Sequence, residues 1–176
     1  EKHVENEWVV YSVGGGALSE GKGKDDIFYT EPVYELSTLK AIQHWCEDSG
    51  RGFWEYTDEC EGSEIWDYLH EVWLMMCNAV ERGLENDGVL PGPLKLSRKA
   101  SNYYIKALSY RSSLQSRGLV YAYALAVSEE NASGGTIVTA PTCGSCGVMP
   151  GVLYHLAKAH QFSERKILRA LATAGL

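Results

Sequence analysis

A run of small and polar residues, Thr-Cys-Gly-Ser-Cys-Gly at positions 142–147, is the part of the sequence best suited to bind a ligand. Thr142 and Ser145 carry hydroxyl groups, and the glycines let the backbone approach a ligand closely. A helix predicted to begin near Pro150 would direct its free N–H groups and positive dipole end toward the run. The pattern predicts a site for a small anion such as a carboxylate, although glycines in a tight buried connection would serve packing alone.

The Cys-x-x-Cys spacing of Cys143 and Cys146 admits two further interpretations. A redox pair is one, because this spacing lowers the pKa of a thiol. Half of a zinc site is the other, but zinc usually takes a second such pair or two histidines. His155 and His160 are five residues apart and do not share one helix face, and the other cysteines are scattered singly: Cys46, Cys60 and Cys77. Two small buried residues in a glycine-rich turn remain the favoured interpretation.

Other polar residues have a functional and a structural interpretation. Residues 129–131, Glu-Glu-Asn, end a predicted buried helix, where negative charge opposes the helix dipole. Such a conflict marks either a functional site or, more commonly, a solvated turn. Arg98 and Lys99 could clamp a carboxylate, or could be an ordinary basic pair on the surface. Packing or surface roles, and not ligand binding, are expected for His44 and His70. Core positions are favoured over a binding cage for the aromatic residues near Trp45, Trp54, Trp66 and Trp73.

Composition narrows the class of protein. The chain has 176 residues, of which 45% are hydrophobic and 22% are charged, as in ordinary globular domains. The net charge of −7 argues against nucleic acid as a partner, and no apolar run approaches the roughly 20 residues that span a membrane. Five cysteines, an odd number, and a polar start without a signal sequence predict a reducing, cytoplasmic setting. The missing initial Met and the small apolar end lead us to expect a fragment of a longer polypeptide.

The sequence predicts a mainly α fold with one strand at the start. Residues 8–13 form a predicted strand with no neighbouring strand nearby, and residues 17–30 form a predicted loop. Helices are predicted from Ser37 as N-cap to residue 48, from Ser63 as N-cap to a C′ residue at Gly83, at 119–127, at 150–160 and from 163 onward. A polar, moderately helical stretch is predicted at 97–113, and residues 128–135 should interrupt the buried helix at 119–127.

Three segments of the sequence resemble bacterial L-serine dehydratases of the iron–sulfur type, also called L-serine ammonia-lyases. These are YSVGGG at 11–16, ERGLENDGVLPGPLKLSRKAS at 81–101 and ALAVSEENASGGTIVTAPTCGSCGVMPGVL at 124–153. The resemblance covers nearly the whole chain. It implies that residues 1–35 are the end of an α/β domain with its linker, and that residues 36–176 are the N-terminal part of an all-α catalytic domain.

The resemblance also implies a reaction. Such enzymes convert L-serine to pyruvate and ammonia with an oxygen-labile [4Fe–4S] cluster and without pyridoxal phosphate. One iron of the cluster acts as a Lewis acid on the substrate hydroxyl while a base removes the Cα proton. In the family, the Thr-x-Gly loop contributes to the substrate pocket, which here implies substrate binding by Thr142, Cys143, Gly144 and Ser145. No metal ligand and no catalytic base are assigned to residues of this chain.

The chain departs from the family pattern in three ways. It lacks the Ser-Ser-Ser-His-Thr stretch, and none of its cysteines lies in a Gly-Cys-Gln-Gly or Cys-Asp-Pro context, where the family holds its cluster. The family usually has Asn where this chain has Cys143, a weaker donor that could alter substrate preference. We therefore expect the chain alone to be inactive. A truncated core would expose apolar faces, for example at residues 119–127, so we also expect self-association as a homo-oligomer. A cysteine desulfidase-type lyase, a non-catalytic binding module and a thiol redox module are the alternatives.

Overall fold

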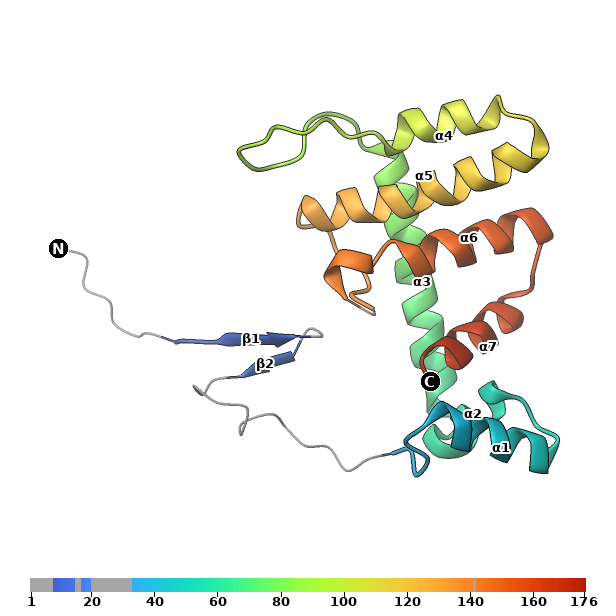
Figure 1. Ribbon diagram of the computed structural model, residues 1–176. Helices are drawn as coiled ribbons and strands as arrows, with labels where there is room; N and C mark the ends of the chain where they lie inside the picture. Colours follow the sequence, from blue (N-terminus) through green and yellow to red (C-terminus); the bar gives the residue numbers. More distant parts are fainter. Residues whose placement is uncertain (1–7, 15–16, 20–32, 141) are drawn as a thin grey trace.

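The computed structural model describes residues 8–14, 17–19, 33–140 and 142–176, which form seven α-helices and one pair of strands (Figure 1). In chain order the elements are β1 (Tyr11–Gly14), β2 (Ala17–Ser19), α1 (Leu39–Ser49), α2 (Phe53–Glu61), α3 (Glu64–Glu85), α4 (Ala100–Leu108), α5 (Ser112–Ala132), the 3₁₀-helix η2 (Cys143–Ser145), α6 (Val148–His160) and α7 (Glu164–Ala174). The mainly α class predicted from the sequence is confirmed.

The first strand has a partner close by in the sequence. β1 pairs with β2 in antiparallel fashion, with Tyr11 opposite Ser19 and Ser12 opposite Leu18. The expectation that this strand lacks a nearby neighbour is therefore wrong. It rested on the glycine- and lysine-rich composition of residues 17–30, whose first three residues form β2, while residues 20–30 of that predicted loop lie outside the described residues.

Helix α5 lies at the centre of the helical body, in contact with α3, α4 and α6 (Figure 1). Ala122, Tyr123, Ala126 and Val127 on this helix are buried. The predicted buried helix at 119–127 is confirmed, but α5 runs from Ser112 to Ala132 without the predicted interruption at 128. The polar residues after Val127 stay helical because they find partners inside the protein, as described below.

Two helix crossings at α5 depend on glycine. A Cβ at Gly83 of α3 would lie 2.3 Å from the carbonyl oxygen of Ala126, and a Cβ at Gly147 would lie 2.1 Å from that of Ala124. Neither side chain could be accommodated without moving a helix. The prediction that Gly83 ends its helix is wrong, because this residue is needed for packing inside α3, which continues to Glu85.

Two helix starts differ from the prediction. The N-cap of α1 is Thr38 and not Ser37, because the Thr38 hydroxyl accepts the N–H of Ala41 at 3.3 Å. Helix α2 was not predicted, since Gly52 at its N-cap position has no capping side chain. The N–H of Gly52 instead donates to the Glu55 carboxylate at 2.8 Å, which stabilises the first turn from within the helix.

The remaining helix ends agree with the sequence to within a few residues. Ser63 occupies the N-cap position of α3 without a side-chain cap hydrogen bond. Helix α6 begins at Val148, two residues before the predicted Pro150, and α7 follows the N-cap position at Ser163 with Glu164 in its first turn. The stretch at 97–113 divides into α4 and the start of α5.

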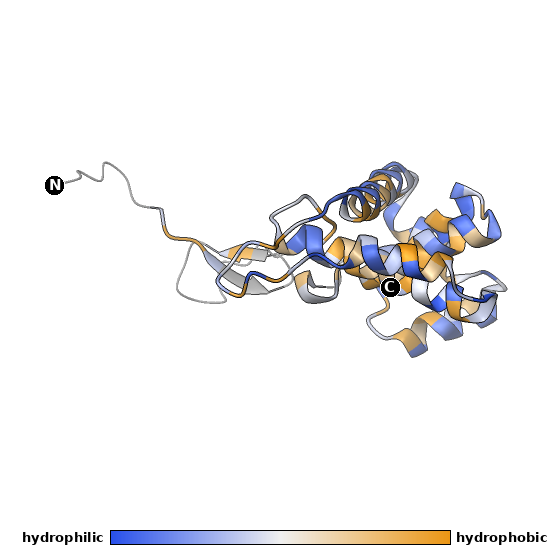
Figure 2. Cartoon of the chain, turned by 90° about the horizontal axis from the view of Figure 1, so that it is seen from above, coloured by the Kyte–Doolittle hydropathy of each residue, from blue (hydrophilic) through white to orange (hydrophobic). Residues whose placement is uncertain are grey.

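The core lies between α3, α5, α6 and α7. Figure 2 shows both hydrophobic and hydrophilic residues on the helices of the helical body. Trp73 and Met76 of α3 are buried among the apolar residues of the other three helices. His44 and His70 each lie beside a carboxylate, Asp48 at 3.4 Å and Glu164 at 2.9 Å, in agreement with their predicted surface or packing roles. Within the described ranges, no helix is long and apolar enough to cross a membrane.

Candidate functional site

The predicted binding residues form one tight turn between α5 and α6. The Thr142 hydroxyl accepts the N–H of Ser145 at 3.3 Å and lies 3.1 Å from the Ser145 hydroxyl. Thr142, Cys143 and Gly144 are exposed and Ser145 is half-buried. A Cβ at Gly144 would approach only the Thr142 hydroxyl, at 3.9 Å, so the space beside this glycine is open. The turn thus presents two hydroxyls, a thiol and an accessible backbone to solvent.

Buried residues connect this turn to α6. Cys146 and Gly147 are buried behind it, and Pro150 is buried in the first turn of the helix. Gly147 lies against Ala124 of α5, so the start of α6 packs closely on that helix. The exposed polar side chains of the loop therefore belong to η2 and to its N-cap residue Thr142. The start of α6 packs against the buried side of the loop.

The two cysteines of the loop have opposite environments. Both are free thiols, but Cys143 is exposed whereas Cys146 is 1% exposed. Burial raises the pKa of the Cys146 thiol, and the nearby Cys143 raises it further. A raised pKa lowers the thiolate fraction, which is the opposite of what a reactive redox pair requires. The other cysteines lie on three separate helices: Cys46 on α1, Cys60 on α2 and Cys77 on α3.

Asn131, in the last turn of α5, holds the loop directly. Its side-chain N–H donates to the carbonyl oxygen of Cys143 at 2.9 Å. The sequence singled out residues 129–131 only for their charge, and nothing local in the sequence connects Asn131 to a residue twelve positions later. The contact arises because the chain reverses direction between α5 and α6.

Glu130 is buried at the centre of a network of basic and amide side chains. Its carboxylate accepts hydrogen bonds from Arg82 Nε at 3.2 Å, Asn86 Nδ2 at 2.9 Å and Arg98 Nη1 at 3.1 Å. Burial pushes the pKa of Glu130 upward, but the bonds from Asn86, Arg82 and Arg98 together outweigh it and leave the pKa below its ordinary value. The expectation of a solvated turn at this position is therefore wrong.

Glu129 is buried as well and binds the N-terminus of α4. Its carboxylate accepts the backbone N–H of Lys99 at 2.6 Å and that of Ala100 at 3.3 Å. The unfavourable position of this charge at the end of α5 is offset because it also lies at the start of α4, where negative charge is stabilised. Arg98 does bind a carboxylate, as the sequence suggested, but the carboxylate is that of Glu130.

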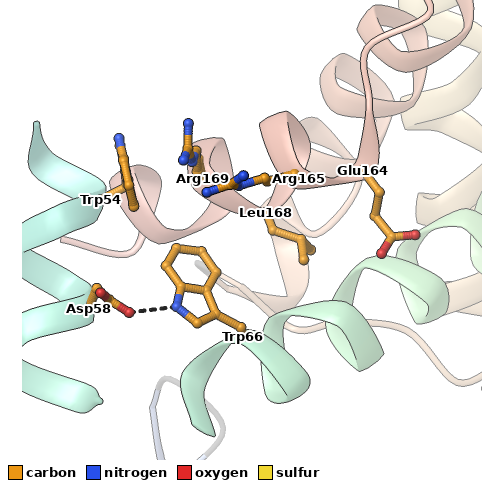
Figure 3. A pocket seen from close by; sticks show the side chains of 7 residues that line it. All are labelled: Trp54, Asp58, Trp66, Glu164, Arg165, Leu168 and Arg169. Carbon is orange, nitrogen blue, oxygen red and sulfur yellow. Dashed lines mark hydrogen bonds between the residues drawn. The ribbon is translucent and has the colours of Figure 1, made fainter. Parts of the chain in front are cut away.

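A pocket of about 440 Å³ lies away from the loop, between α2, α3 and α7 (Figure 3). Its polar groups contact one another: Trp66 Nε1 donates to Asp58 at 2.6 Å, and the Arg169 guanidinium lies 3.9 Å from the centre of the Trp54 ring. The residues that line it are Trp54, Asp58, Trp66, Glu164, Arg165, Leu168 and Arg169.

A second pocket of about 440 Å³ lies between α5 and α6. Within it the Ser116 hydroxyl lies 2.7 Å from His155 Nε2. Burial lowers the pKa of His155, and the nearby His160 lowers it further. Neither of these two pockets includes residues of the Thr142–Ser145 turn.

Comparison with known proteins identifies the family. Residues 24–176 match the family described as serine dehydratase alpha chain. The chain is 35% identical over 179 residues to L-serine dehydratase of Haemophilus influenzae, an alignment that covers 94% of this chain and 39% of that protein. Streptomyces coelicolor L-serine dehydratase gives the same identity and coverage, and L-serine dehydratase 2 of Escherichia coli is 35% identical over 159 residues, covering 84% of this chain and 35% of that protein.

The chain spans about two fifths of the length of these relatives. The family match nevertheless extends over the whole helical body, from before α1 to the end of α7. It includes the Thr142–Ser145 turn, Asn131 and the network around Glu130. On this match, the chain belongs to the serine dehydratase alpha chain family.

Proposed function

We propose that the whole protein containing this chain is an L-serine ammonia-lyase, which converts L-serine to pyruvate and ammonia. Membership of the serine dehydratase alpha chain family and relatives named L-serine dehydratase support this proposal. The observation that carries it within this chain is the exposed turn in which the hydroxyls of Thr142 and Ser145 lie 3.1 Å apart. Two hydroxyls side by side suit the two oxygens of a carboxylate.

In this proposal the turn binds the carboxylate of serine. On binding, the hydroxyls of Thr142 and Ser145 exchange the hydrogen bond between them for bonds donated to the carboxylate oxygens, and Gly144 lets the substrate approach the backbone. The Cys143 thiol lies exposed on the same turn and is a weak donor. Holding the carboxylate at this turn orients the Cα–H and Cβ–OH bonds, both of which must break, relative to the rest of the active site.

In the overall reaction, serine first loses one water molecule and the resulting product later takes one up. Removal of the Cα proton and departure of the Cβ hydroxide convert serine to the enamine aminoacrylate. The enamine tautomerises to an imine, and water then adds to the imine carbon and releases ammonia, which leaves pyruvate. In this scheme the side chains of the turn bind the substrate.

The cysteines of this chain do not fit an iron–sulfur cluster. In the described residues, no three Cys, His, Asp or Glu side chains gather as a metal-binding group. The only two cysteines close in sequence differ in burial, with Cys143 exposed and Cys146 buried. We propose that a [4Fe–4S] cluster in the whole protein takes its ligands from residues outside this chain.

Further proposals concern the surroundings of the site. A domain boundary near residue 35, a cytoplasmic location and a homo-oligomeric assembly remain part of this proposal. So does the expectation that this chain alone is inactive. Two observations support the boundary: the strand pair ends at Ser19, and the helical body begins with α1 at Leu39.

The proposal is tested with the whole protein purified without oxygen. We expect pyruvate release from L-serine, with activity that tracks iron content and decays in air. Sulfide from L-cysteine without pyruvate from L-serine would favour a cysteine desulfidase-type lyase. Absence of both iron and turnover would favour a non-catalytic binding module. A Thr142→Val variant should raise the KM for L-serine, because valine has nearly the same shape as threonine but lacks the hydroxyl.

A further inference from the structure

We infer that Asn131 is a positioning residue that sets the conformation of the Thr142–Ser145 turn, and that the buried network around Glu130 holds Asn131 in place. The inference rests on the proposed function, because it assigns the turn to substrate binding. It goes further because the residues that set the conformation of the turn lie on α5, on α3 and on the connector before α4. None of these elements carries a residue assigned to contact substrate.

The first step is the hydrogen bond from Asn131 to the turn. The side-chain N–H of Asn131 donates to the Cys143 carbonyl oxygen at 2.9 Å. The peptide group between Cys143 and Gly144 is planar, with its carbonyl and N–H groups pointing in opposite directions. Fixing the carbonyl oxygen on Asn131 therefore directs the N–H of Gly144 away from α5. One side-chain contact thus sets the orientation of a whole peptide group in the turn.

The second step is the support of Asn131 itself. The adjacent residue, Glu130, accepts hydrogen bonds from Arg82 and Asn86 of the α3 end and from Arg98 of the connector. Arg98 also donates to the Ser133 hydroxyl at 2.6 Å, just after α5. The last turn of α5 is therefore held from two sides, and Asn131 cannot rotate about the helix axis without breaking these bonds.

The third step is the chain that leaves α5. The N–H of Gly135 donates to the Glu130 carbonyl oxygen at 2.9 Å, and Arg82 Nη2 donates to the carbonyl oxygen of Thr136 at 2.5 Å. Arg82, which binds the Glu130 carboxylate, thus also binds the segment leading toward the turn. The segment is fixed at Thr136, and the turn is fixed again at Cys143.

The hydrogen bond to the Cys143 carbonyl oxygen needs the side-chain N–H of asparagine at position 131. Aspartate has almost the same shape, but its carboxylate cannot donate to a carbonyl oxygen and would repel it. Asn131→Asp therefore removes the hydrogen bond with little change in volume, and Asn131→Ala removes both the bond and the side chain. Asn102, exposed on α4, provides the matched control Asn102→Ala.

Two readouts on the whole protein test the inference. The first is the steady-state kinetics of pyruvate release from L-serine. We expect Asn131→Asp and Asn131→Ala to raise the KM about tenfold and to leave kcat within about twofold, because carboxylate binding is shared by substrate and transition state. Asn102→Ala should change neither value.

The second readout does not depend on activity. Cys146 is buried behind the turn, so its alkylation by iodoacetamide, followed by mass spectrometry, reports how firmly the turn is held. We expect about tenfold faster alkylation of Cys146 in both Asn131 variants, with Cys77 of α3 alkylated at the wild-type rate. An unchanged Cys146 rate, or an equal acceleration at Cys77, would overturn the inference. Failure of the wild-type protein to act on serine would reject the proposed function, while the alkylation rates would still decide whether Asn131 positions the turn.

Discussion

Gly147, the N-cap residue of α6, and Ala124 of α5 lie so close together that a Cβ at position 147 would be 2.1 Å from the Ala124 carbonyl oxygen. No side chain can occupy this position unless α5 and α6 move apart. The turn that carries Thr142 and Ser145 lies just before this crossing and bonds to the end of α5. The separation of the two helices therefore determines where the turn lies.

Gly147→Ala should destabilise the protein, since the added methyl group overlaps a main-chain oxygen. We expect the free energy of unfolding to fall by about 1–3 kcal/mol, as for other overpacked cores. Urea denaturation would measure the loss. Gly144→Ala is the control, because its Cβ would meet only the Thr142 hydroxyl, at 3.9 Å. Equal losses in the two variants would contradict the importance of the helix crossing.

Glu130→Gln should cost stability in a way that depends on pH. The variant leaves the buried Arg98 and the partly exposed Arg82 without their carboxylate, and breaking a buried ion pair such as Glu130–Arg98 costs about 3–5 kcal/mol. The folded-state pKa of Glu130 is lowered from 4.5, so the stabilisation is complete above that value and is lost as pH falls through the folded-state pKa. The stability difference between wild type and variant, measured by urea denaturation at pH 7 and at successively lower pH, should shrink below about pH 4.5.

The control for this prediction is Glu71→Gln, since Glu71 is exposed on α3. A surface carboxylate contributes little, so this variant should remain within about 0.5 kcal/mol of wild type at every pH. A Glu130→Gln protein that matched this control at pH 7 would show that the network contributes no net stability.

The two loop cysteines should react with thiol reagents at very different rates. Cys143 is exposed, whereas Cys146 is buried and its pKa is raised, so restricted access and a low thiolate fraction both slow the reaction of Cys146. Mass spectrometry after brief alkylation should find Cys143 modified well before Cys146. Mild oxidant should leave the number of titratable thiols unchanged. Loss of two thiols, restored by a reductant, would instead support a redox role for the pair.

Cys143→Asn should strengthen substrate binding in the whole protein. Asparagine offers an amide N–H, a stronger donor than the cysteine thiol, at an exposed position of the turn. We expect a KM for L-serine about two- to tenfold lower, with kcat nearly unchanged. Cys46→Ser on α1 serves as the control for removing a thiol elsewhere. A KM that rises in Cys143→Asn would indicate that the thiol itself fits the natural substrate.

Elements with a strong local signal were predicted well from the sequence. Helix α3 shows apolar residues at three- and four-residue steps, and its central Trp73 and Met76 are buried as that pattern requires. Helix α2 escaped prediction because its first turn depends on the side chain of Glu55 and not on a capping residue before the helix. The true length of α5 was missed because Glu129 and Glu130 read as polar helix-breaking sequence when their partners are unknown.

The residue types of the candidate site could be predicted from the sequence, but the residues that hold the turn in place could not. Thr142 and Ser145 were chosen because hydroxyl groups and glycines occur together, and the structure brings the two hydroxyls into contact. Asn131 can bond to the turn only because the chain returns from α5 to η2. Arg82 can bond to Glu130 only because the fold brings together two residues 48 positions apart in the sequence. Composition and periodicity carry no information about such contacts.

Backbone hydrogen bonds join the two ends of the connector between α3 and α4. The N–H of Leu90 donates to the carbonyl oxygen of Leu96 at 2.7 Å, and the N–H of Arg98 donates to that of Gly88 at 2.8 Å. Since Glu130 binds both Arg82 of α3 and Arg98 near the end of this connector, the chain before the tip and the chain after it are held together without the peptide bonds at the tip. The tip near Gly92 is therefore a natural place for new chain ends, where a cut or a circular permutation would leave the helical body assembled.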